Sequence, residues 1–422
     1  MKKTRLIVIA VLLFALCLYG CADTPIVTPT QLIESETLES GTHTPASSAM
    51  PEPPLFESLT LQESISEHIN SVSTTGNAYT AILNDGTLVN AGLYEPGDEY
   101  PNSDKDNVIG TVINISSSRW VSLAIDTEGA LWGWGTPLWG QLMGAEQDER
   151  GPIILMENVQ LASAGLYHCL ALRTDGTVWT WGSGESGVIG DGLDTKDKIL
   201  RTSSNPLKTP VKVLENAIYI CASEFACYAI KEDGTLWAWG DIGIADKSGE
   251  TCRFTPEPIM SGVKYVSGGA QALAIKDDGS LWAWGKTFRD MAEVGGPLPY
   301  FERGEPTEIM NGVRYAYSGW ERYAVIKEDG SLWVWGDNRN GALGDGTDEF
   351  RREPQKVMDN IAFVTSSEIH ILAVTSSGEL WELGTPAGLF NDPETGEWRE
   401  LTDEELFQSR LPHKIMDGIL VP

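Results

Sequence analysis

Basic residues are scarce in this sequence of 422 residues. Its 30 lysines and arginines stand against 60 aspartates and glutamates, and the formal net charge is −30. Binding to nucleic acid depends on Lys and Arg side chains that neutralise phosphates, so this balance argues against DNA or RNA as a partner. The same charge disfavours direct adsorption of the folded domain to an anionic membrane or cell wall. We expect it to serve solubility outside the cell or to attract a cationic partner.

Residues typical of metal and catalytic sites are also few. The five histidines are His43, His68, His168, His370 and His413. None lies in a His-Glu-x-x-His motif or beside a serine in a nucleophile elbow. No Cys-x-x-Cys pair and no Cys/His zinc spacing occurs, and the acidic loops do not match the EF-hand pattern. The sequence therefore predicts a protein that is not an enzyme and has no metal and no cofactor.

The apolar run near the N-terminus is too short to span a bilayer. Leu6 to Leu18 follows a basic start and is typical of the apolar region of an export signal. The following Leu-Tyr-Gly-Cys resembles a bacterial lipobox, which implies a signal peptide over residues 1–20 and acylation of Cys21. An ordinary cleaved signal peptide is the alternative. The expected location is the bacterial cell membrane, with the chain lipid-anchored and facing outside the cytoplasm.

Residues 21–58 join the anchor to the rest of the chain. After Cys21 this segment is rich in Thr, Pro, Ser and Glu and contains no Lys or Arg. Such a composition cannot bury a core, so we expect a disordered, extended tether. The tether would hold residues 59–422 away from the membrane.

One motif recurs seven times in those residues: an Asp-Gly-like turn, followed six residues later by a Trp-Gly-like doublet. The turn glycines are Gly86, Gly129, Gly176, Gly234, Gly279, Gly330 and Gly378, spaced 43, 47, 58, 45, 51 and 48 residues apart. Repeats of this size, filled with strand-like segments, are typical of a β-propeller in which each repeat is one blade. We predict an all-β fold, a seven-bladed propeller of four-stranded antiparallel blades.

The direction of successive strands assigns the connections to two faces. Asp-Gly turns and the short connections between blades fall on one face, here called the bottom face. The loops after the Trp-Gly doublets vary in length and fall on the opposite, top face. Variable loops on a rigid scaffold usually form the binding surface, so we expect binding at the top face. Pro412–Met416 or Leu59–Ile65 could supply the strand that closes the ring.

Short hairpin tips between the first and second strands also lie on the top face, and four of them carry an aromatic residue. Exposed aromatic side chains are effective interface anchors. The predicted partner-binding residues are Trp120, Tyr167, Phe225, Trp320, Arg119, Glu224 and Glu321. Folding of the longer loops over these tips is the alternative. The paired tryptophans of the third strands, such as Trp237 and Trp239, are instead expected to pack between blades.

Four cysteines lie within the repeats: Cys169, Cys221, Cys227 and Cys252. Cys169 and Cys227 occupy the same position in neighbouring repeats. Cys221 and Cys227 fall on the two arms of one expected hairpin, where a disulfide is conceivable. We favour the alternative that these are small buried thiols in strands.

The sequence of these repeats resembles that of the repeats of the regulator of chromosome condensation family. It reads YAIKEDGTLWAWG at 228–240 and WGDNRNGALGDGT at 335–347, and the trailing Gly-x-Leu-Gly-Asp-Gly element returns as GVIGDG at 187–192. The resemblance covers Ile69 to the C-terminus and implies a propeller. The founding member exchanges guanine nucleotide on a nuclear GTPase through a β-wedge. No such wedge is identifiable here, so that activity is not expected of this chain.

In its exported setting the chain is similar to the β-lactamase inhibitor protein II type. Those secreted bacterial seven-bladed propellers clasp an enzyme with aromatic-rich loops on one face. Together with the expected lipid anchor and the lack of catalytic motifs, this similarity leads us to expect a monomeric, surface-anchored, non-catalytic propeller that captures an extracellular or envelope protein with its top face. An envelope glycan-binding or glycan-processing propeller is the alternative, because carboxylate pairs for glycoside hydrolysis cannot be judged from sequence spacing.

Overall fold

The structure is a computed structural model. It describes residues 69–75, 78–83, 88–92, 109, 111–118, 120–135, 137–144, 152–193, 205–269, 271–285, 305–319, 322–366, 371–383, 389–391, 398–400, 407 and 410–416. The predicted signal peptide, Cys21 and the tether lie outside these residues. Within them, no helix is both long and apolar enough to cross a membrane.

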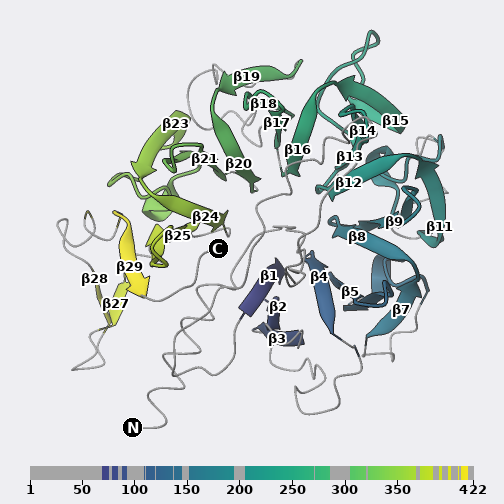
Figure 1. Cartoon of the computed structure of the whole chain (residues 1–422), viewed down its shortest axis with the longest axis horizontal. Helices are drawn as coiled ribbons and strands as arrows, with labels where there is room; N and C mark the ends of the chain where they lie inside the picture. The colour runs from purple at the N-terminus through teal and green to yellow at the C-terminus, as the bar shows by residue number, and fades with distance from the viewer. Residues whose placement is uncertain are drawn as a thin grey trace, which may run out of the picture.

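The described strands form antiparallel sheets arranged radially, each with its first strand nearest the centre (Figure 1). The inner strands are β1 (Ile69–Thr75), β4 (Val112–Ser117), β8 (Val159–Ala164), β12 (Ala217–Ala222), β16 (Val263–Gly268), β20 (Val313–Ser318) and β24 (Ile361–Ser366). The second strands are β2 (Ala78–Leu83), β5 (Val121–Asp126), β9 (His168–Arg173), β13 (Ala226–Lys231), β17 (Gln271–Lys276), β21 (Arg322–Lys327) and β25 (Ile371–Thr375).

The third strands are β3 (Leu88–Gly92), β6 (Leu131–Gly135), β10 (Val178–Gly182), β14 (Leu236–Asp241), β18 (Leu281–Gly285), β22 (Leu332–Gly336) and β26 (Leu380–Leu383). The outer strands are β7 (Ile153–Met156), β11 (Leu207–Leu214), β15 (Cys252–Met260), β19 (Thr307–Met310), β23 (Arg351–Met358) and β29 (His413–Met416). Strands β27 (Leu389–Asn391) and β28 (Trp398–Glu400) form a separate hairpin.

Six of the radial sheets have four strands, and the first has the three strands β1, β2 and β3 among the described residues. Each sheet corresponds to one sequence repeat. The predicted all-β propeller of antiparallel blades is therefore confirmed. Strand β29 pairs with β26, so the stretch 412–416 provides the fourth strand of the last blade. Leu59–Ile65 lies outside the described residues.

On the bottom face, described turns are hydrogen-bonded to the connections that enter the next blade or their own. The N–H of Ala217 donates to the carbonyl of Gly176 at 3.0 Å, and the N–H of Thr174 donates to the carbonyl of Asn158 at 2.9 Å. Asn158 has φ +59°, a left-handed conformation that Asn adopts more readily than most residues. Gly262 has φ +68° at the equivalent position two blades later. The predicted tight bottom turns are present wherever the structure describes them.

The second tryptophan of each pair packs between blades, as predicted. Trp181 and Trp239 are completely buried, and the indole N–H of Trp239 donates to the carbonyl of Val188 in the preceding blade at 2.9 Å. The first tryptophan of each pair is only half-buried, and in four blades a cation of the same blade lies over its ring. The ammonium of Lys231 is 4.1 Å from the centre of the Trp237 ring. Such cation–π pairs stabilise exposed sites by about 0.5–1 kcal/mol.

Side chains of the inner strands also link neighbouring blades. The hydroxyl of Ser163 accepts the N–H of Ala222 at 2.9 Å, and the Sγ of Cys221 accepts the N–H of Gly268 at 3.3 Å. These acceptors occupy the same position, the fifth residue of their inner strands. Cys221 thus stands where the second, third and fifth blades have Ser116, Ser163 and Ser267.

The four cysteines described are free thiols. A Cys221–Cys227 disulfide is excluded by register, because Cys221 is opposite Tyr228 and Cys227 is opposite Ala222. Side chains one position apart point to opposite faces of a sheet. Cys169, Cys221 and Cys227 are buried, as we favoured, and Cys252 is half-buried. Burial raises the pKa of the Cys169 and Cys227 thiols.

The Asp-Gly turns predict a loss of stability in acid. Hydrogen bonds from Thr177 hold the pKa of Asp175 below its ordinary value, and the pKa values of Asp233, Asp278 and Asp329 are lowered in the same way by the Thr or Ser two residues later. A carboxylate whose pKa is lower in the folded state stabilises it above the unfolded pKa of about 4, and this contribution disappears as the pH falls through the folded value.

Replacing all four aspartates by asparagine is expected to lower the melting temperature at neutral pH. The difference from the unmodified chain should shrink as the pH falls below about 4, because only the unmodified turns titrate there. Thermal unfolding followed by circular dichroism between neutral and acidic pH measures this. A difference that stays constant with pH would show that the charge of these carboxylates is irrelevant.

Candidate functional site

Three aromatic side chains form a row on the top face, across the boundary between the second and third blades. The rings of Trp120 and Trp139 are 4.7 Å apart between centroids, and those of Trp139 and Tyr167 are 5.1 Å apart. Each pair of ring planes is tilted by 45°. All three side chains are half-buried, and the neighbouring Leu138 is 51% exposed. We call Trp120, Trp139 and Tyr167 the aromatic row.

The row contains the aromatic residues of two predicted tips and, between them, Trp139, which the sequence analysis did not single out. Trp139 lies in the short 3-10 helix η1 (Pro137–Trp139), in the loop that follows β6. Its signal in the sequence is positional: Gly140 follows Gly135 at the spacing by which Gly187 follows Gly182. Trp139 therefore takes the place that Ser186 has one blade later. Comparison of the loops position by position would have drawn attention to it.

The Trp-Gly doublets fix the backbone of the aromatic tips. Gly182 has φ +107°, and a Cβ added to it would be 2.6 Å from the carbonyl oxygen of Tyr167. The next N–H, of Ser183, donates to that same carbonyl at 2.8 Å. Gly240 repeats this arrangement at the carbonyl of Phe225. Only glycine allows this close approach at a positive φ, so the doublet positions the tip.

Buried polar contacts hold the row from below. The carbonyl of Gln141 accepts the indole N–H of Trp181 at 2.6 Å, and its side-chain amide donates to the carbonyl of Gly165 at 3.3 Å. The ring of His168, directly after Tyr167, is fully buried with Nε2 3.1 Å from the Sγ of Cys227. Burial lowers the pKa of His168 to about 3, so the imidazole is neutral and supports the structure.

Four of the seven predicted partner-binding residues lie among the described residues. Trp120 and Tyr167 belong to the aromatic row, and Phe225 is 41% exposed at the tip of the next blade, beside the half-buried Glu224. Within the described part of the chain, no ring contact joins Phe225 to the row. Trp320, Arg119 and Glu321 lie outside the described residues.

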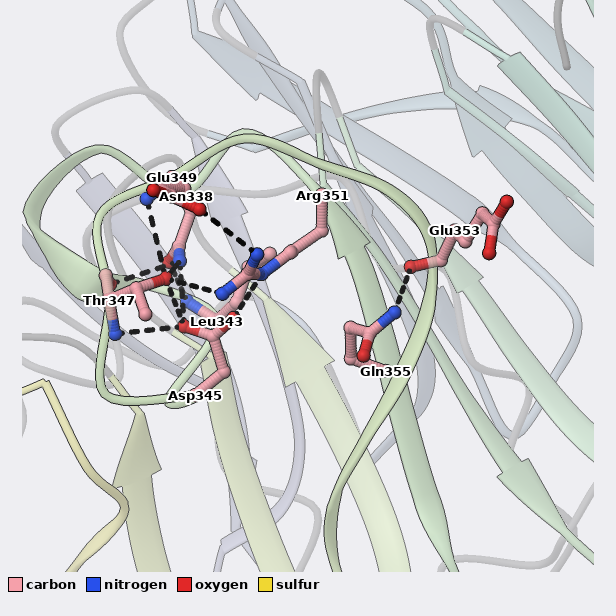
Figure 2. Close-up of polar contacts among 8 residues, drawn as sticks. All are labelled: Asn338, Leu343, Asp345, Thr347, Glu349, Arg351, Glu353 and Gln355. Atoms are coloured by element: carbon pink, nitrogen blue, oxygen red, sulfur yellow. Dashed lines mark hydrogen bonds and ion pairs between the residues drawn. The ribbon is translucent and has the colours of Figure 1, made fainter. Parts of the chain in front are cut away.

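The loop after β22 shows how a top-face loop of this chain is made rigid (Figure 2). The side-chain amide of Asn338 donates to Asp345 at 2.9 Å, and its oxygen accepts the N–H of Leu343 at 2.8 Å. Asp345 also accepts the N–H and hydroxyl of Thr347 and pairs with Arg351. The side chains of this loop thus satisfy one another.

The acidic residues of this loop are paired with arginines. Asp345 contacts Arg351, and the carboxylate of Asp348 lies 2.6 Å from the guanidinium of Arg410. Among the residues that the structure describes, no three His, Cys, Asp or Glu side chains are grouped as metal ligands would be. These carboxylates therefore serve the loop's own structure.

A buried ion pair anchors the start of the same loop. The guanidinium of Arg322 lies 3.1 Å from the carboxylate of Asp337 and also donates to its carbonyl at 2.9 Å. Their side chains are only 8% and 4% exposed. The same carboxylate contacts Arg339 on the surface at 2.9 Å.

The radial sheets, tight bottom turns and long top loops define a β-propeller. Two segments match sequence profiles described as the regulator of chromosome condensation (RCC1) repeat, at residues 159–188 and 329–374. The chain therefore carries RCC1 repeats.

Two known proteins are similar in sequence to this chain over longer stretches. The chain is 26% identical over 274 residues to the ultraviolet-B receptor UVR8 of Arabidopsis thaliana, covering 61% of this chain and 58% of the receptor. It is 26% identical over 292 residues to the E3 ubiquitin-protein ligase HERC2 of Mus musculus, covering 65% of this chain and 6% of the ligase. The chain thus spans less than two thirds of the length of either relative.

Solved structures show the same fold. Human WBSCR16 aligns with a TM-score of 0.58 at 20% identity, covering 72% of this chain and 85% of that one. Yeast RCC1 (Prp20), solved with Kap60 bound, aligns with a TM-score of 0.58 at 17% identity, covering 81% and 82%. Prp20p of Saccharomyces cerevisiae, whose binding properties to Gsp1p and histones accompany its structure, aligns with a TM-score of 0.56 at 18% identity, covering 70% and 80%.

Proposed function

We propose that this chain is a surface-anchored, non-catalytic propeller that captures an extracellular or envelope protein with its top face. Acylation of Cys21 and the tether 21–58 would attach residues 59–422 to the outside of the cytoplasmic membrane. The observation that carries the proposal is the aromatic row, which places two tryptophans and a tyrosine together on the loop-bearing face.

The row has the properties of an interface anchor. Its side chains are partly exposed, and the backbone beneath Trp139 and Tyr167 is fixed by Gly182, Ser183 and Gln141. Tryptophan and tyrosine are enriched among residues that dominate binding energy. Pre-organisation reduces the entropy that binding must overcome. Yeast Prp20, which shares the fold, is recorded with protein partners, which is consistent with a protein-binding role for this scaffold.

The shape of the row favours a protein over a glycan. Sugar rings are puckered, and they stack the C–H groups of one ring face on an aromatic face that they can cover. Here successive planes are tilted by 45°, so the row does not present one continuous flat platform. An irregular row with the exposed Leu138 beside it suits the varied apolar side chains of a protein surface.

Replacing Trp120 by alanine is expected to weaken partner binding by roughly 10- to 100-fold, because truncation of an aromatic interface anchor costs about 1.5–3 kcal/mol. Affinity capture from native cell surfaces, with the unmodified and variant chains compared side by side, identifies the partner. Titration of the purified partner then gives the ratio of affinities.

The matched control is Ile154→Ala, since Ile154 is 54% exposed on the outer strand β7 and outside the row. It should bind like the unmodified chain, and both variants should keep the native circular dichroism spectrum. Equal affinity in the folded Trp120→Ala chain would exclude the row as the binding site.

A further inference from the structure

Four of the bottom-face tryptophan rings have cations from their own blades. Lys231 lies 4.1 Å from the Trp237 ring centre, and Lys276 lies 4.3 Å from the Trp282 ring centre. Of the lysines and arginines that the structure describes, none lies over Trp139. A half-buried indole with no described cation over its ring can take one supplied from outside.

The described charges on the neighbouring top-face segments are mostly negative. Glu185 is exposed in the third blade, at the position that Leu138 occupies in the second, and Asp191 follows in the same loop. Glu224 lies at the tip of the fourth blade. One described cation, Lys208, lies beside this region. It belongs to the outer strand β11, and its aliphatic stem lies against Gly144.

The charge of the whole chain acts in the same direction. A formal net charge of −30 produces a long-range field that attracts cationic partners and repels anionic ones. Electrostatic steering of this kind raises association rates and weakens with salt. The net charge of the chain and the indole face of Trp139 therefore both favour a cationic ligand.

We propose that the aromatic row binds a basic segment of the partner protein, with an arginine side chain stacked on Trp139 and flanking basic residues facing the acidic top face. This inference rests on the proposed protein-binding function and specifies its partner. Arginine fits better than lysine because its planar guanidinium stacks on aromatic rings and is weakly hydrated.

A pair of synthetic peptides tests the chemistry directly. The first alternates arginine with glycine, and its twin replaces each arginine by citrulline, which keeps the planar end group without its charge. Calorimetric titration of the full chain should show the arginine peptide binding at least about 10-fold tighter than the citrulline twin, with affinity falling as salt rises.

Variants separate stacking on Trp139 from attraction to the overall charge. Trp139→Ala should weaken binding of the arginine peptide by about 3- to 30-fold, and Trp139→Phe by less, because phenylalanine keeps an aromatic face. Ile154→Ala should bind normally. Equal binding by the Trp139→Ala chain, equal binding of the citrulline twin, or no binding of the arginine peptide would each overturn the inference.

These results are distinguishable from a failure of the proposed function. If a captured protein depends on Trp120 while the arginine peptide does not bind, the protein-binding function stands and the basic occupant is wrong. If the arginine peptide binds at Trp139 while no protein is captured through the row, the recognition chemistry holds and the capture function is wrong. Loss of both would reject both.

Discussion

Replacing Asp337 by alanine is expected to lower the free energy of unfolding by about 3–5 kcal/mol, because it leaves the buried guanidinium of Arg322 without its carboxylate. Both side chains are almost completely buried, with 3.1 Å between their charged atoms. Denaturant unfolding followed by tryptophan fluorescence measures the change.

The same carboxylate provides the control. Arg339 also contacts Asp337, at 2.9 Å, but its side chain is 65% exposed. Arg339→Ala should therefore change stability by less than about 1 kcal/mol, as exposed ion pairs usually do. Arg322→Ala should resemble Asp337→Ala. Similar small effects for all three variants would show that burial does not govern this pair.

Replacing Gly182 by alanine is expected to destabilise the chain by about 2–4 kcal/mol, since strain and steric overlap act together. The new Cβ would be 2.6 Å from the carbonyl oxygen of Tyr167, on a residue with φ +107°. Relief requires movement of the tip that carries Tyr167. Partner binding by the folded fraction should weaken as well.

Gly249 separates the two causes. It has φ +85°, and an added Cβ would meet no atom within 4 Å. Gly249→Ala should therefore show only the conformational penalty, about 1–2 kcal/mol. Thermal and denaturant unfolding of the two variants give the comparison. An equal loss in both would mean that the contact with the Tyr167 carbonyl is unimportant.

The fold could be predicted from the repeat motif, because the residues of the motif stabilise local features of the backbone. In four turns the Asp accepts hydrogen bonds from the residue two positions later, as Asp233 does from Thr235. The glycine of the Trp-Gly doublet allows the close approach seen at Gly182 and Gly240. Features that depend on local backbone geometry repeat in sequence, so blades, faces and tips follow from spacing.

Contacts between blades are less visible in a sequence. The aromatic row forms because Trp139 of one blade reaches between Trp120 and Tyr167, and no spacing within a repeat encodes that meeting. The direction of each cysteine side chain depends on strand register. Cys221 and Cys227, close along the chain, point to opposite neighbours for this reason.

The most direct test of a binding top face is cross-linking from one residue on each face. A photoreactive phenylalanine analogue replaces Leu138 beside the aromatic row in one chain, and Asp233 in an exposed bottom turn in the other. Illumination of cells carrying each chain should join a protein to position 138 and not to position 233. Cross-links at 233 alone, or at neither position, would contradict capture by the top face.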